Sequence, residues 1–524
     1  MSTYTSDNDR SAYPADISPS KSNGSISYNP TPHLIPEGDN AVALEVTGST
    51  ATDKLIIIMV GLPATGKTYI AKRICRYITF FHDIPAQIFN SSNYRRKLFG
   101  VMPANFFDHS NAEGLAQRTT ACNAALDDLV DYMKKDGVRV SVYDATCSTR
   151  ERRDHVLKKL VDENLHCNKM FVESICEEEE FLEENIRELK LSTPDYHNID
   201  PDDAAKDFNE RREQYKAVYE PLDDRDGSYL TVFNYCKFMV NKVRGYLPLK
   251  VVHFIMNLHT LPRTFYLSRH GQSEYNDLAK IGGDSGLTKA GLEYARRLAN
   301  FCKDEISVKT VIDPDTDKEV KKEIPARLWT STMQRTKETA QFIDHSPLDN
   351  LWDNGEKREW LQFRPRARRN LDEIYAGICD GLSYKEIEEQ FPDEFARRQK
   401  DKLSYRYPRG ESYMDVILRL EPLAHELERI REPILIIAHQ GIHRILYAYF
   451  MGLDRAQAPY ISIPLNTVIQ LTPHAYGCHE KRISLMQKSE LKCSDDGQDE
   501  PVTNVSMSES FSKDNVSSLN MSSP

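Results

Sequence analysis

Residues 54–68 read KLIIIMVGLPATGKT, and this stretch decides the fold of the first half of the chain. Its apolar, β-branched run predicts a buried strand, and GLPATGKT matches the pattern GxxxxGK[ST], a turn that leads from a strand into a helix. The main-chain N–H groups of such a turn cradle phosphate at the positive end of the helix dipole. We therefore expect an anion-binding loop at 61–68, with Lys67 neutralising the outer phosphates and the Thr68 hydroxyl holding Mg²⁺.

Similar strand-like runs alternate with helix-period stretches along the chain. In the first half they lie at Val138–Asp144 and Lys169–Ser174, and in the second half at Thr264–Gly271, Ala326–Ser331 and Pro433–Gly441. Alternation of this kind is typical of βαβ units around a buried, largely parallel sheet. The sequence predicts an α/β protein with two such domains.

The remaining segments suggest the domain limits. Residues 1–50 and 488–524 are rich in Ser, Asp and Asn and poor in large apolar residues, so we expect disordered tails there. The apolar VVHFIM run within Gly245–Leu261 predicts an edge strand or an inter-domain element. We expect one domain at 51–250 and a second at 251–487.

Composition restricts the class of protein. The chain has 524 residues, with 68 Lys and Arg against 79 Asp and Glu, a net charge of −11. This balance argues against binding of nucleic acid or an anionic membrane, so we expect phosphate binding to be local. No apolar run approaches the roughly 20 residues of a membrane span, and the ten cysteines lack metal-site spacing, which favours a cytoplasmic protein with reduced thiols.

Charged and imidazole side chains follow several of the predicted strands. Asp144 ends the first-half run VRVSVYD, where a carboxylate can reach a metal ion or take a proton from an acceptor hydroxyl. In the second half, His270 and His439 end two strands, and Arg335 follows a third. An unprotonated His270 could attack phosphorus among these cations, with Glu373 as proton donor, although spacing allows the neighbouring Asp372 equally well.

With these residues in place, the chain resembles the 6-phosphofructo-2-kinase/fructose-2,6-bisphosphatase family, in particular a fungal-type member, over about residues 54–485. The resemblance rests on LIIIMVGLPATGKTYIAKR, YDATCSTRERRDHV, KLSTPDY, YLSRHGQSEYN, LWTSTMQRT and the AHQG strand end. It implies a P-loop, nucleoside-kinase-like domain that phosphorylates O2 of fructose 6-phosphate with MgATP. It also implies a histidine-phosphatase domain of the phosphoglycerate-mutase type, which hydrolyses fructose 2,6-bisphosphate through a phosphohistidine without a cofactor and so regulates glycolysis.

The resemblance also implies site residues. For the kinase, ATP would lie on Gly61, Leu62, Pro63, Ala64, Thr65, Gly66, Lys67, Thr68, Tyr69, Asn185 and Lys190, with Mg²⁺ on Thr68 and Asp144, Asp144 as the catalytic carboxylate and Cys176 as a further catalytic candidate. Fructose 6-phosphate would meet Arg95, Arg118, Thr146, Arg152, Lys190, Arg211 and Tyr215. For the phosphatase, the chemistry would involve Arg269, His270, Asn276, Arg335, Glu373 and His439, while the rest of the sugar would meet Gly282, Tyr384, Arg398, Lys402, Tyr413, Gln440 and Arg444.

Other hypotheses remain beside the bifunctional enzyme. One is a monofunctional fructose-2,6-bisphosphatase whose first domain binds nucleotide but is weakly active as a kinase, and another is a non-catalytic nucleotide-sensing scaffold. A homodimer is what the resemblance implies, and Ser508 and Ser510 make the tail a candidate protein-kinase substrate. Arg364–Arg369 and Asp313–Glu323 are expected to be solvated loop insertions.

Overall fold

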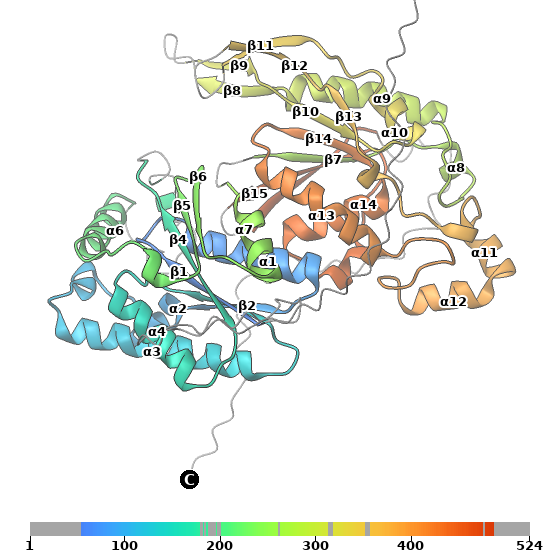
Figure 1. Cartoon of the computed structure of the whole chain (residues 1–524). Coiled ribbons are helices and arrows are strands. Elements are labelled where there is room, and N and C mark those ends of the chain that lie inside the picture. The colour runs from blue at the N-terminus through green and yellow to red at the C-terminus, as the bar shows by residue number, and fades with distance from the viewer. Residues whose placement is uncertain are drawn as a thin grey trace, which may run out of the picture. The chain divides into compact units, whose positions relative to one another are not determined.

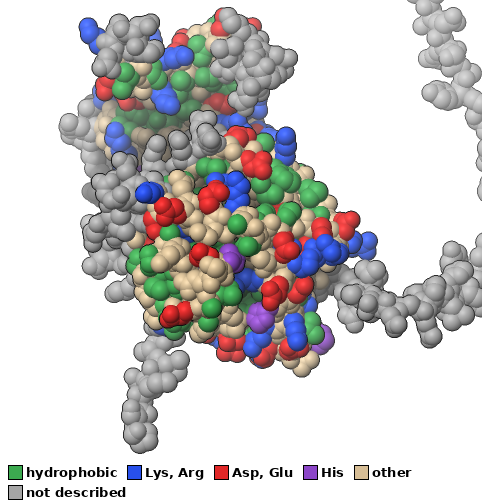
Figure 2. Space-filling model, turned by 90° about the vertical axis from the view of Figure 1, so that its left-hand side faces the viewer, with side chains coloured by type: hydrophobic (Ala, Val, Ile, Leu, Met, Phe, Trp, Pro, Cys, Tyr) green, Lys and Arg blue, Asp and Glu red, His purple; other side chains and the backbone are tan. Residues whose placement is uncertain are grey.

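The computed structural model describes residues 54–178, 182, 185–186, 195, 201–259, 263–312, 318–351, 357–474 and 477–486 (Figure 1). The tails expected at 1–50 and 488–524, and also Lys190, lie outside the described residues. Within the described part of the chain, no helix combines the length and apolar character needed to cross a membrane. On the face shown in Figure 2, basic and acidic side chains are interspersed.

The first half forms a six-stranded sheet in the order β2-β3-β1-β4-β5-β6. Its strands are β1 (Leu55–Val60), β2 (Ala86–Asn90), β3 (Val140–Asp144), β4 (Asn168–Ile175), β5 (Tyr229–Phe233) and β6 (Lys237–Asn241). All neighbours are parallel except β5 and β6, which are antiparallel. The central strand β1 is buried along its whole length, which explains its continuous apolar sequence.

Helices cover both faces of this sheet. They are α1 (Lys67–His82), α2 (Ser91–Phe99), α3 (Ala112–Lys134), α4 (Arg150–Asp162) and α6 (Pro201–Lys216). Alternate residues of β1 pack on opposite sides: Ile56 and Ile58 pack with α3 and α4, whereas Leu55 and Ile57 pack with α1. The predicted parallel α/β domain with the phosphate loop at a strand end is therefore confirmed.

The second half forms another six-stranded sheet, in the order β13-β10-β14-β7-β15-β16. Its strands are β7 (Phe265–Arg269), β10 (Arg327–Thr330), β13 (Pro365–Ala367), β14 (Ile434–Ala438), β15 (Thr467–His474) and β16 (Gly477–Ser484). The first four in this order are parallel, and β15 and β16 run antiparallel to their neighbours. The strands predicted at 264–271, 326–331 and 433–441 thus lie side by side at the centre of the sheet.

The helices of the second half again lie on both faces, with α9 against one face and α13 and α14 against the other. The set comprises α8 (Glu274–Asp277), α9 (Lys289–Phe301), α10 (Gln334–Ala340), α11 (Tyr384–Gln390), α12 (Pro392–Lys400), α13 (Tyr413–Arg429) and α14 (Gln440–Met451). Two hairpins, β8 (Val308–Ile312) with β9 (Glu319–Glu323) and β11 (Pro347–Leu351) with β12 (Lys357–Leu361), complete the described strands. Short helical turns are η1 (Ala104–Phe107), η3 (Asp224–Asp226), η4 (Cys302–Ile306), η5 (Arg369–Leu371), η6 (Gly377–Cys379) and η7 (Arg455–Tyr460).

Some local predictions were wrong. The VVHFIM run belongs to helix α7 (Tyr246–Ile255) and not to an edge strand, because Leu247, Val251 and Ile255 recur every four residues and are all buried. The other alternative, an inter-domain element, agrees with the ring contacts of Phe254 to Tyr77 of α1 and His425 of α13. The boundary expected at residue 250 therefore falls inside this helix. Within the two expected loop insertions, Pro365–Ala367 and Glu319–Glu323 form strands, although both are fully exposed as expected.

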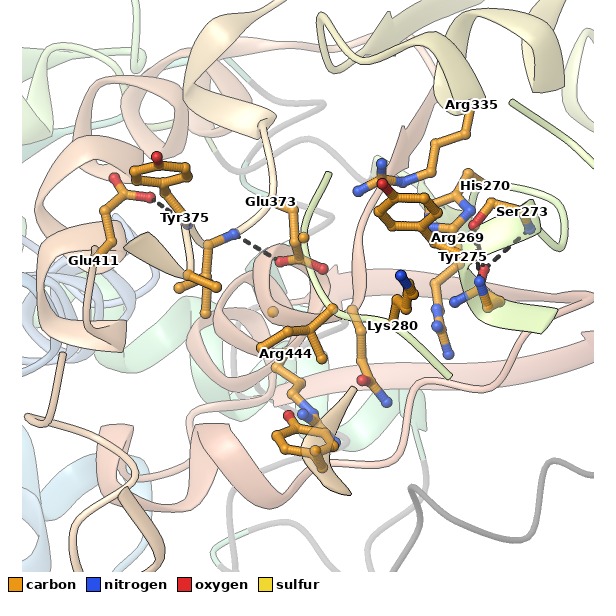
Figure 3. A pocket seen from close by; sticks show the side chains of 18 of the residues that line it. Arg269, His270, Ser273, Tyr275, Lys280, Arg335, Glu373, Tyr375, Glu411 and Arg444 are labelled. Carbon is orange, nitrogen blue, oxygen red and sulfur yellow. Dashed lines mark hydrogen bonds between the residues drawn. The ribbon is translucent and has the colours of Figure 1, made fainter. Parts of the chain in front are cut away.

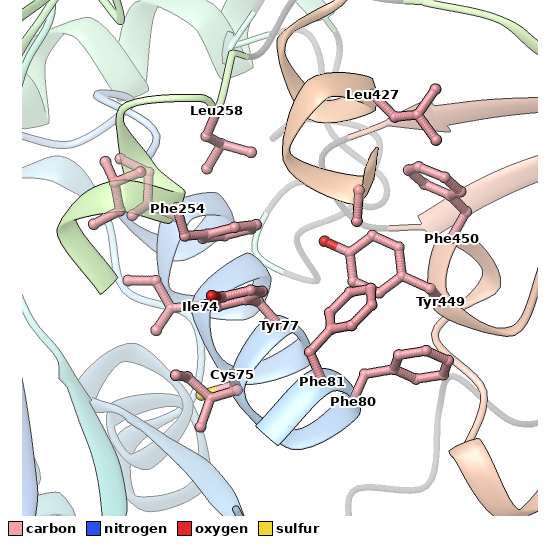
Figure 4. Packing of buried hydrophobic residues seen from close by; sticks show 14 of the residues in the cluster. Ile74, Cys75, Tyr77, Phe80, Phe81, Phe254, Leu258, Leu427, Tyr449 and Phe450 are labelled. Carbon is pink, nitrogen blue, oxygen red and sulfur yellow. The ribbon is translucent and has the colours of Figure 1, made fainter. Parts of the chain in front are cut away.

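The core of the protein continues from one sheet to the other through α1. Helix α1 contacts α7 and α13 (Figure 1). The ring of Tyr77 stacks on Phe254 at a centroid distance of 4.4 Å, and Phe81 packs against Tyr449 of α14 at 5.0 Å (Figure 4). These rings belong to one buried cluster that includes side chains of both sheets. The two halves are consequently joined by a contact in which buried aromatic rings predominate.

A buried ion cluster crosses the same contact. Glu428 of α13 is fully buried and pairs with Arg73 of α1 and with Arg263, which precedes β7. The Tyr449 hydroxyl donates a further hydrogen bond to Glu428 at 2.8 Å. Burial raises the pKa of Glu428, but the charges of Arg73 and Arg263 outweigh burial and lower it to about 2. The carboxylate therefore stays charged and holds together three segments of the chain.

We expect Glu428→Gln to destabilise the protein by about 3–5 kcal/mol, because it leaves two buried guanidinium groups without a counter-charge. The control Glu426→Gln, which removes a partly exposed pair with Arg368 from the same helix, should cost at most about 1 kcal/mol. Urea unfolding midpoints measure both effects.

The pH dependence of this effect follows from the lowered pKa of Glu428. Its contribution to stability is fully present above the ordinary value of 4.5 and is lost as pH falls towards 2. The difference between wild type and Glu428→Gln should therefore be constant from pH 7 to about 4.5 and shrink below it. A difference that grew on acidification would contradict the assignment.

Candidate active sites

The turn after β1 has the conformation that the phosphate-loop pattern requires. Gly61 and Gly66 have φ angles of +137° and +81°. A Cβ atom on Gly61 would lie 2.4 Å from the carbonyl oxygen of Ser174, and one on Gly66 would lie 2.0 Å from the hydroxyl of Tyr235. Side chains are therefore excluded at both ends of the loop, where the backbone passes closest to its neighbours.

The carbonyl groups of this loop are tied to the surrounding protein. Asn185 donates to the carbonyl oxygen of Ala64 at 2.8 Å, and Ser174 and Tyr235 both donate to that of Thr65, the latter at 3.0 Å. The first N–H groups of a helix have no partner within the helix. The N–H groups at the start of α1 are thus the ones that remain for an anion, and Asn185 supports the loop through its backbone.

Lys67, Thr68 and Asp144 meet at the loop as predicted. Lys67 is buried and donates to the carbonyl oxygen of Leu62, and burial lowers its pKa to about 8 against the opposing attraction of Asp144. The Thr68 hydroxyl donates to Asp144 Oδ2 at 2.7 Å, and the amide of Asn90, which the sequence analysis missed, donates to the same oxygen at 2.5 Å. An anion beside Lys67 would favour the protonated ammonium.

The oxygen atoms of Thr68 and Asp144 fit Mg²⁺. A hydroxyl and one carboxylate are the kind of ligands that magnesium takes when nucleotide phosphates and water complete its shell. The described residues contain no cluster of three or more His, Cys, Asp or Glu side chains that could hold a metal ion by itself. A divalent ion at this site would therefore depend on the phosphates for its remaining ligands.

Two predicted kinase residues are engaged inside the protein. The Tyr69 side chain is buried, and its hydroxyl donates to the carbonyl oxygen of His259 at 3.1 Å, which links α1 to the segment after α7. Cys176 is buried as well, and burial raises its pKa to about 11, so that the thiol is protonated at neutral pH. Tyr69 therefore has a visible structural role, and Cys176 lacks the properties of an activated nucleophile.

The predicted sugar-phosphate residues gather around two phenylalanines, Phe106 and Phe107. The guanidinium groups of Arg95 and Arg211 lie 5.6 and 4.0 Å from the centroid of Phe107. Arg118 lies 5.8 Å from the ring of Phe106 and donates to its carbonyl oxygen at 2.7 Å. Arginines that are far apart in sequence thus form one buried cationic cluster.

Other residues predicted to bind the sugar phosphate border this arginine cluster. The ring of Tyr215 lies 6.2 Å from Phe107. Burial and, to a smaller extent, the neighbouring charge of Arg152 lower the pKa of Arg118, which places Arg152 in the same field. The carbonyl oxygen of Thr146 accepts the N–H of Gly61 at 3.0 Å. This bond connects the segment that follows β3 to the phosphate loop.

Asp195 is the principal residue that the sequence analysis missed in this half. Its Oδ2 accepts from Arg95 at 2.5 Å and from Arg96 at 3.2 Å, and Arg211 lies 3.8 Å away. Asp195 stands in the KLSTPDY motif, but nothing in the motif's spacing indicates which arginines it contacts. The carboxylate fixes the directions of cations that would otherwise repel one another.

In the second half, a pocket opens at the carboxyl ends of β7 and β14 (Figure 3). The rings of His270 and His439 face each other at a centroid distance of 5.1 Å. Predicted residues that line the pocket are Arg269, His270, Asn276, Gly282, Arg335, Glu373, Tyr384, Arg398, Tyr413, Gln440 and Arg444. His439 is fully buried behind this lining, and Lys402 lies outside it with its ammonium 5.3 Å from the ring of Tyr460.

The hydrogen bond of His270 defines its free nitrogen. Nδ1 lies 2.8 Å from the carbonyl oxygen of Gly271. Because a carbonyl can only accept, Nδ1 carries the proton and the lone pair of the neutral ring is on Nε2. Burial, followed by the charges of Arg335 and Arg269, holds the pKa of His270 well below its usual range. His270 is therefore a neutral imidazole beside two cations, with a lone pair on Nε2, which are the properties that the predicted nucleophile needs.

The structure separates the two carboxylates that spacing left open. Glu373 lines the pocket, whereas Asp372 is outside the lining and accepts from the Thr332 N–H at 2.7 Å and from the Thr332 hydroxyl. A Cβ atom on Gly441 would lie 2.8 Å from Glu373 Oε1. This geometry supports Glu373 as the proton donor and shows that Gly441 leaves room for it.

Further residues line the pocket that the sequence analysis did not name: Ser273, Tyr275, Lys280, Ile281, Ile374, Tyr375, Ala376, Tyr407, Glu411 and Gly441. The Ser273 N–H and hydroxyl donate to Asn276 Oδ1 at 3.1 and 3.0 Å. Since an N–H can only donate, the amide oxygen of Asn276 is identified and its NH₂ group remains to bind an anion. Ser-x-x-Asn at a helix start was the available sequence signal for this arrangement.

These two arrangements support two forms of phosphoryl chemistry. The first half contains a phosphate loop with a buried lysine and a carboxylate, and it also contains an arginine cluster. Phosphoryl transfer from a nucleotide to an anionic acceptor uses groups of these kinds. In the second half, a neutral imidazole lies among arginines and near a carboxylate, as transfer of a phosphoryl group to histidine requires.

Comparison with known proteins agrees with this chemistry. Residues 44–262 match the family 6-phosphofructo-2-kinase, and residues 265–485 match the histidine phosphatase superfamily (branch 1). A Saccharomyces cerevisiae protein named fructose-2,6-bisphosphatase is 40% identical, with 82% of this chain and 88% of that protein covered. The 6-phosphofructo-2-kinase/fructose-2,6-bisphosphatase of Gallus gallus is 40% identical, with 82% of this chain and 84% of that protein covered. The Homo sapiens protein named 6-phosphofructo-2-kinase/fructose-2,6-bisphosphatase 1 is 39% identical, again with 82% of this chain and 84% of that protein covered.

We expect Gly441→Ala to lower the rate of phosphate release from a phosphomonoester by about tenfold or more, because the methyl group displaces the Glu373 carboxylate. The protein should still fold, since alanine is a good helix former. Gly286→Ala is the matched control, because its Cβ would meet neighbours only at 3.4 Å or beyond. Equal rates for both variants in a phosphate-release assay would argue against Glu373 as the donor.

The pH profile offers a separate check. The low pKa of His270 keeps the free enzyme's nucleophile unprotonated at and below pH 6.5, so kcat/KM for phosphate release should not fall between pH 7.5 and 6.5 on its account. Arg335→Gln removes a cation that lowers this pKa, so the acid limb should move to higher pH while activity drops. An acid limb that did not move would show that Arg335 does not act on His270.

Proposed function

The chain belongs to the 6-phosphofructo-2-kinase/fructose-2,6-bisphosphatase family, and from this premise we propose that it is a bifunctional enzyme of fructose 2,6-bisphosphate metabolism. Its first half makes fructose 2,6-bisphosphate from fructose 6-phosphate and MgATP, and its second half hydrolyses that product to fructose 6-phosphate and phosphate. The observation that carries the proposal is the presence of both sites in one chain: Thr68 lies 2.7 Å from Asp144, and His270 faces His439 at 5.1 Å.

In the kinase half, the N–H groups at the start of α1 and the Lys67 ammonium hold the nucleotide phosphates. Thr68 and Asp144 would hold Mg²⁺, which when bound neutralises charge on the transferred phosphoryl group. The arginine cluster around Phe107 binds the phosphate of fructose 6-phosphate and directs the O2 hydroxyl of the sugar towards the phosphate loop. Asp144 is the carboxylate positioned to take the proton of that hydroxyl.

In the phosphatase half, Nε2 of His270 attacks the 2-phosphoryl group, and the bond between phosphorus and O2 breaks. Glu373 gives a proton to the departing O2, while Arg269, Arg335 and the Asn276 amide stabilise charge on the phosphoryl oxygens. Water then attacks the phosphohistidine, Glu373 takes its proton, and cleavage of the nitrogen–phosphorus bond releases phosphate. The cationic lining of the pocket stabilises both steps without a metal ion.

The relative named only for its phosphatase activity keeps a second hypothesis open, a fructose-2,6-bisphosphatase with a weakly active kinase half. The hydrogen bonds from Thr68 and Asn90 to Asp144 support an active kinase, since they hold a carboxylate beside the phosphate loop, where phosphoryl transfer uses one. A nucleotide-sensing scaffold would not need the neutral, buried imidazole of His270. Family resemblance further supports a homodimer, the cysteine spacing supports a cytoplasmic location, and the serine-rich C-terminal tail is a candidate substrate of protein kinases.

We expect His270→Ala to abolish phosphate release and the acid-labile phosphoenzyme while leaving ATP-dependent synthesis of fructose 2,6-bisphosphate largely intact. Lys67→Ala should have the opposite effect, because the two groups lie in separate sites. Purified variants are assayed in both directions, with wild type as the reference. Wild-type protein that formed no fructose 2,6-bisphosphate from MgATP and fructose 6-phosphate would favour the monofunctional hypothesis.

A further inference from the structure

Ser331, at the end of β10, is a buried hydroxyl that the reaction described above does not use. It is fully buried and is absent from the pocket lining, yet its Oγ lies 2.8 Å from Nε2 of His439. The Thr336 hydroxyl lies 2.8 Å from the same Oγ, and the Met333 N–H donates to it at 3.2 Å. His439 thus rests on a small polar network behind the pocket.

The direction of each hydrogen bond in this network can be deduced. The Nε of Arg335 lies 3.3 Å from Nδ1 of His439 and can only donate, so Nδ1 is an acceptor. A neutral His439 then carries its proton on Nε2 and donates it to Ser331. Because Ser331 already accepts from His439 and Met333, its own hydrogen goes to Thr336. The hydroxyl of Thr336 in turn donates to the carbonyl oxygen of Met333 at 2.8 Å.

This order matters when a phosphoryl group enters the pocket. Arg335 then donates to the phosphoryl oxygens, and an oxygen near Nδ1 of His439 needs a donor there. In the free protein, burial and the charge of Arg335 hold the pKa of His439 well below its usual range. Since Nε2 keeps its proton towards Ser331, Nδ1 can donate only if the ring becomes an imidazolium by taking a proton from the acid form of the entering phosphoryl group or from water, and the negative charge of the bound group favours this transfer. The lone pair of Ser331 stabilises that cation, because a hydrogen bond from a charged donor is stronger than one from a neutral donor.

We propose that Ser331 is a positioning residue of the bisphosphatase: it accepts the Nε2 proton of His439, orients the ring and supports its charged form when the phosphoryl group is bound. The inference rests on the proposed function of the second half. Other charged or titratable groups that face His439 are Arg335 from α10, His270 and Arg269 from the end of β7, and His443 from α14. These groups are the same in all variants considered below, so differences between variants report on Ser331.

The test compares Ser331→Ala with wild type in the full-length protein, with fructose 2,6-bisphosphate as substrate. We expect kcat for phosphate release to fall about 10- to 100-fold with little change in KM, since the hydroxyl does not touch the substrate. The basic limb of the kcat profile should move about one unit to lower pH, because without the acceptor the imidazolium requires more acid conditions. ATP-dependent synthesis by the kinase half should be unchanged.

A second pair of variants separates this role from packing. Thr336→Val keeps the shape of Thr336 but removes the acceptor of the Ser331 hydrogen, so it should shift the limb in the same direction by a smaller amount. Thr336→Ser restores the hydroxyl and should restore the profile. Ser307→Ala removes a buried hydroxyl far along the same domain, where Ser307 bonds to the carbonyl oxygen of Cys302, and should leave the profile at wild type.

The tautomer itself can be observed without activity by ¹⁵N NMR of histidine-labelled free protein. Wild type should show the His439 ring protonated at Nε2, with this proton in a hydrogen bond. In Ser331→Ala the tautomer set by Arg335 should persist, and the Nε2–H resonance should lose its hydrogen-bond shift. The inference would be overturned if Ser331→Ala kept the kcat and the basic limb of wild type, or if its kcat fell while the limb did not move. Equal losses of kcat in Thr336→Val and Thr336→Ser would overturn it as well. Should Ser331→Ala not fold, the Thr336 pair decides; wild type that released no phosphate would instead refute the proposed function.

Discussion

Helix α1 imposes the main constraint on this structure, because it serves two purposes at once. Its first residues form the anion loop, and most of its remaining residues are buried between the first sheet and the helices of the second half. A buried helix cannot carry an uncompensated charge, yet Arg73 lies in its middle. Glu428 of α13 supplies the counter-charge, so the helix that shapes the nucleotide site is completed only by the phosphatase half.

The two sites manage positive charge differently. In the kinase half, the arginines around Phe107 share the carboxylate of Asp195, which holds them together before an anion arrives. In the phosphatase half, Arg269 and Arg335 donate to the carbonyl oxygens of Ile463 and Gly283. Carbonyl oxygens orient a guanidinium group without cancelling its charge, and the carboxylate that acts most strongly on Arg335 is Glu373 of the pocket lining. Burial, and then the charges of Arg335 and Arg269, hold the pKa of His270 well below its usual range.

The sequence predicted the parts of the fold that depend on local pattern. Uniformly apolar runs located β1, β3, β4, β7, β10 and β14, because central parallel strands are buried on both faces. The polar edge strand β13 and the helix α7 were missed, since a neighbouring strand and a buried face decide them. In the sites, the phosphate-loop pattern and the paired strand-end histidines were visible. Asn90, Asp195 and Ser331 were not, because each acquires its role only through a residue far away in sequence.

The two histidines show why residue type alone does not define a role. Both follow neighbouring parallel strands and their rings lie 5.1 Å apart, yet their nitrogens meet different partners. For His270 the partner is a carbonyl oxygen, which puts the proton on Nδ1 and leaves the lone pair on Nε2. For His439 it is the Ser331 hydroxyl, while Nδ1 lies beside Arg335. The two rings therefore hold opposite tautomers, and the difference lies in the residues that surround each ring.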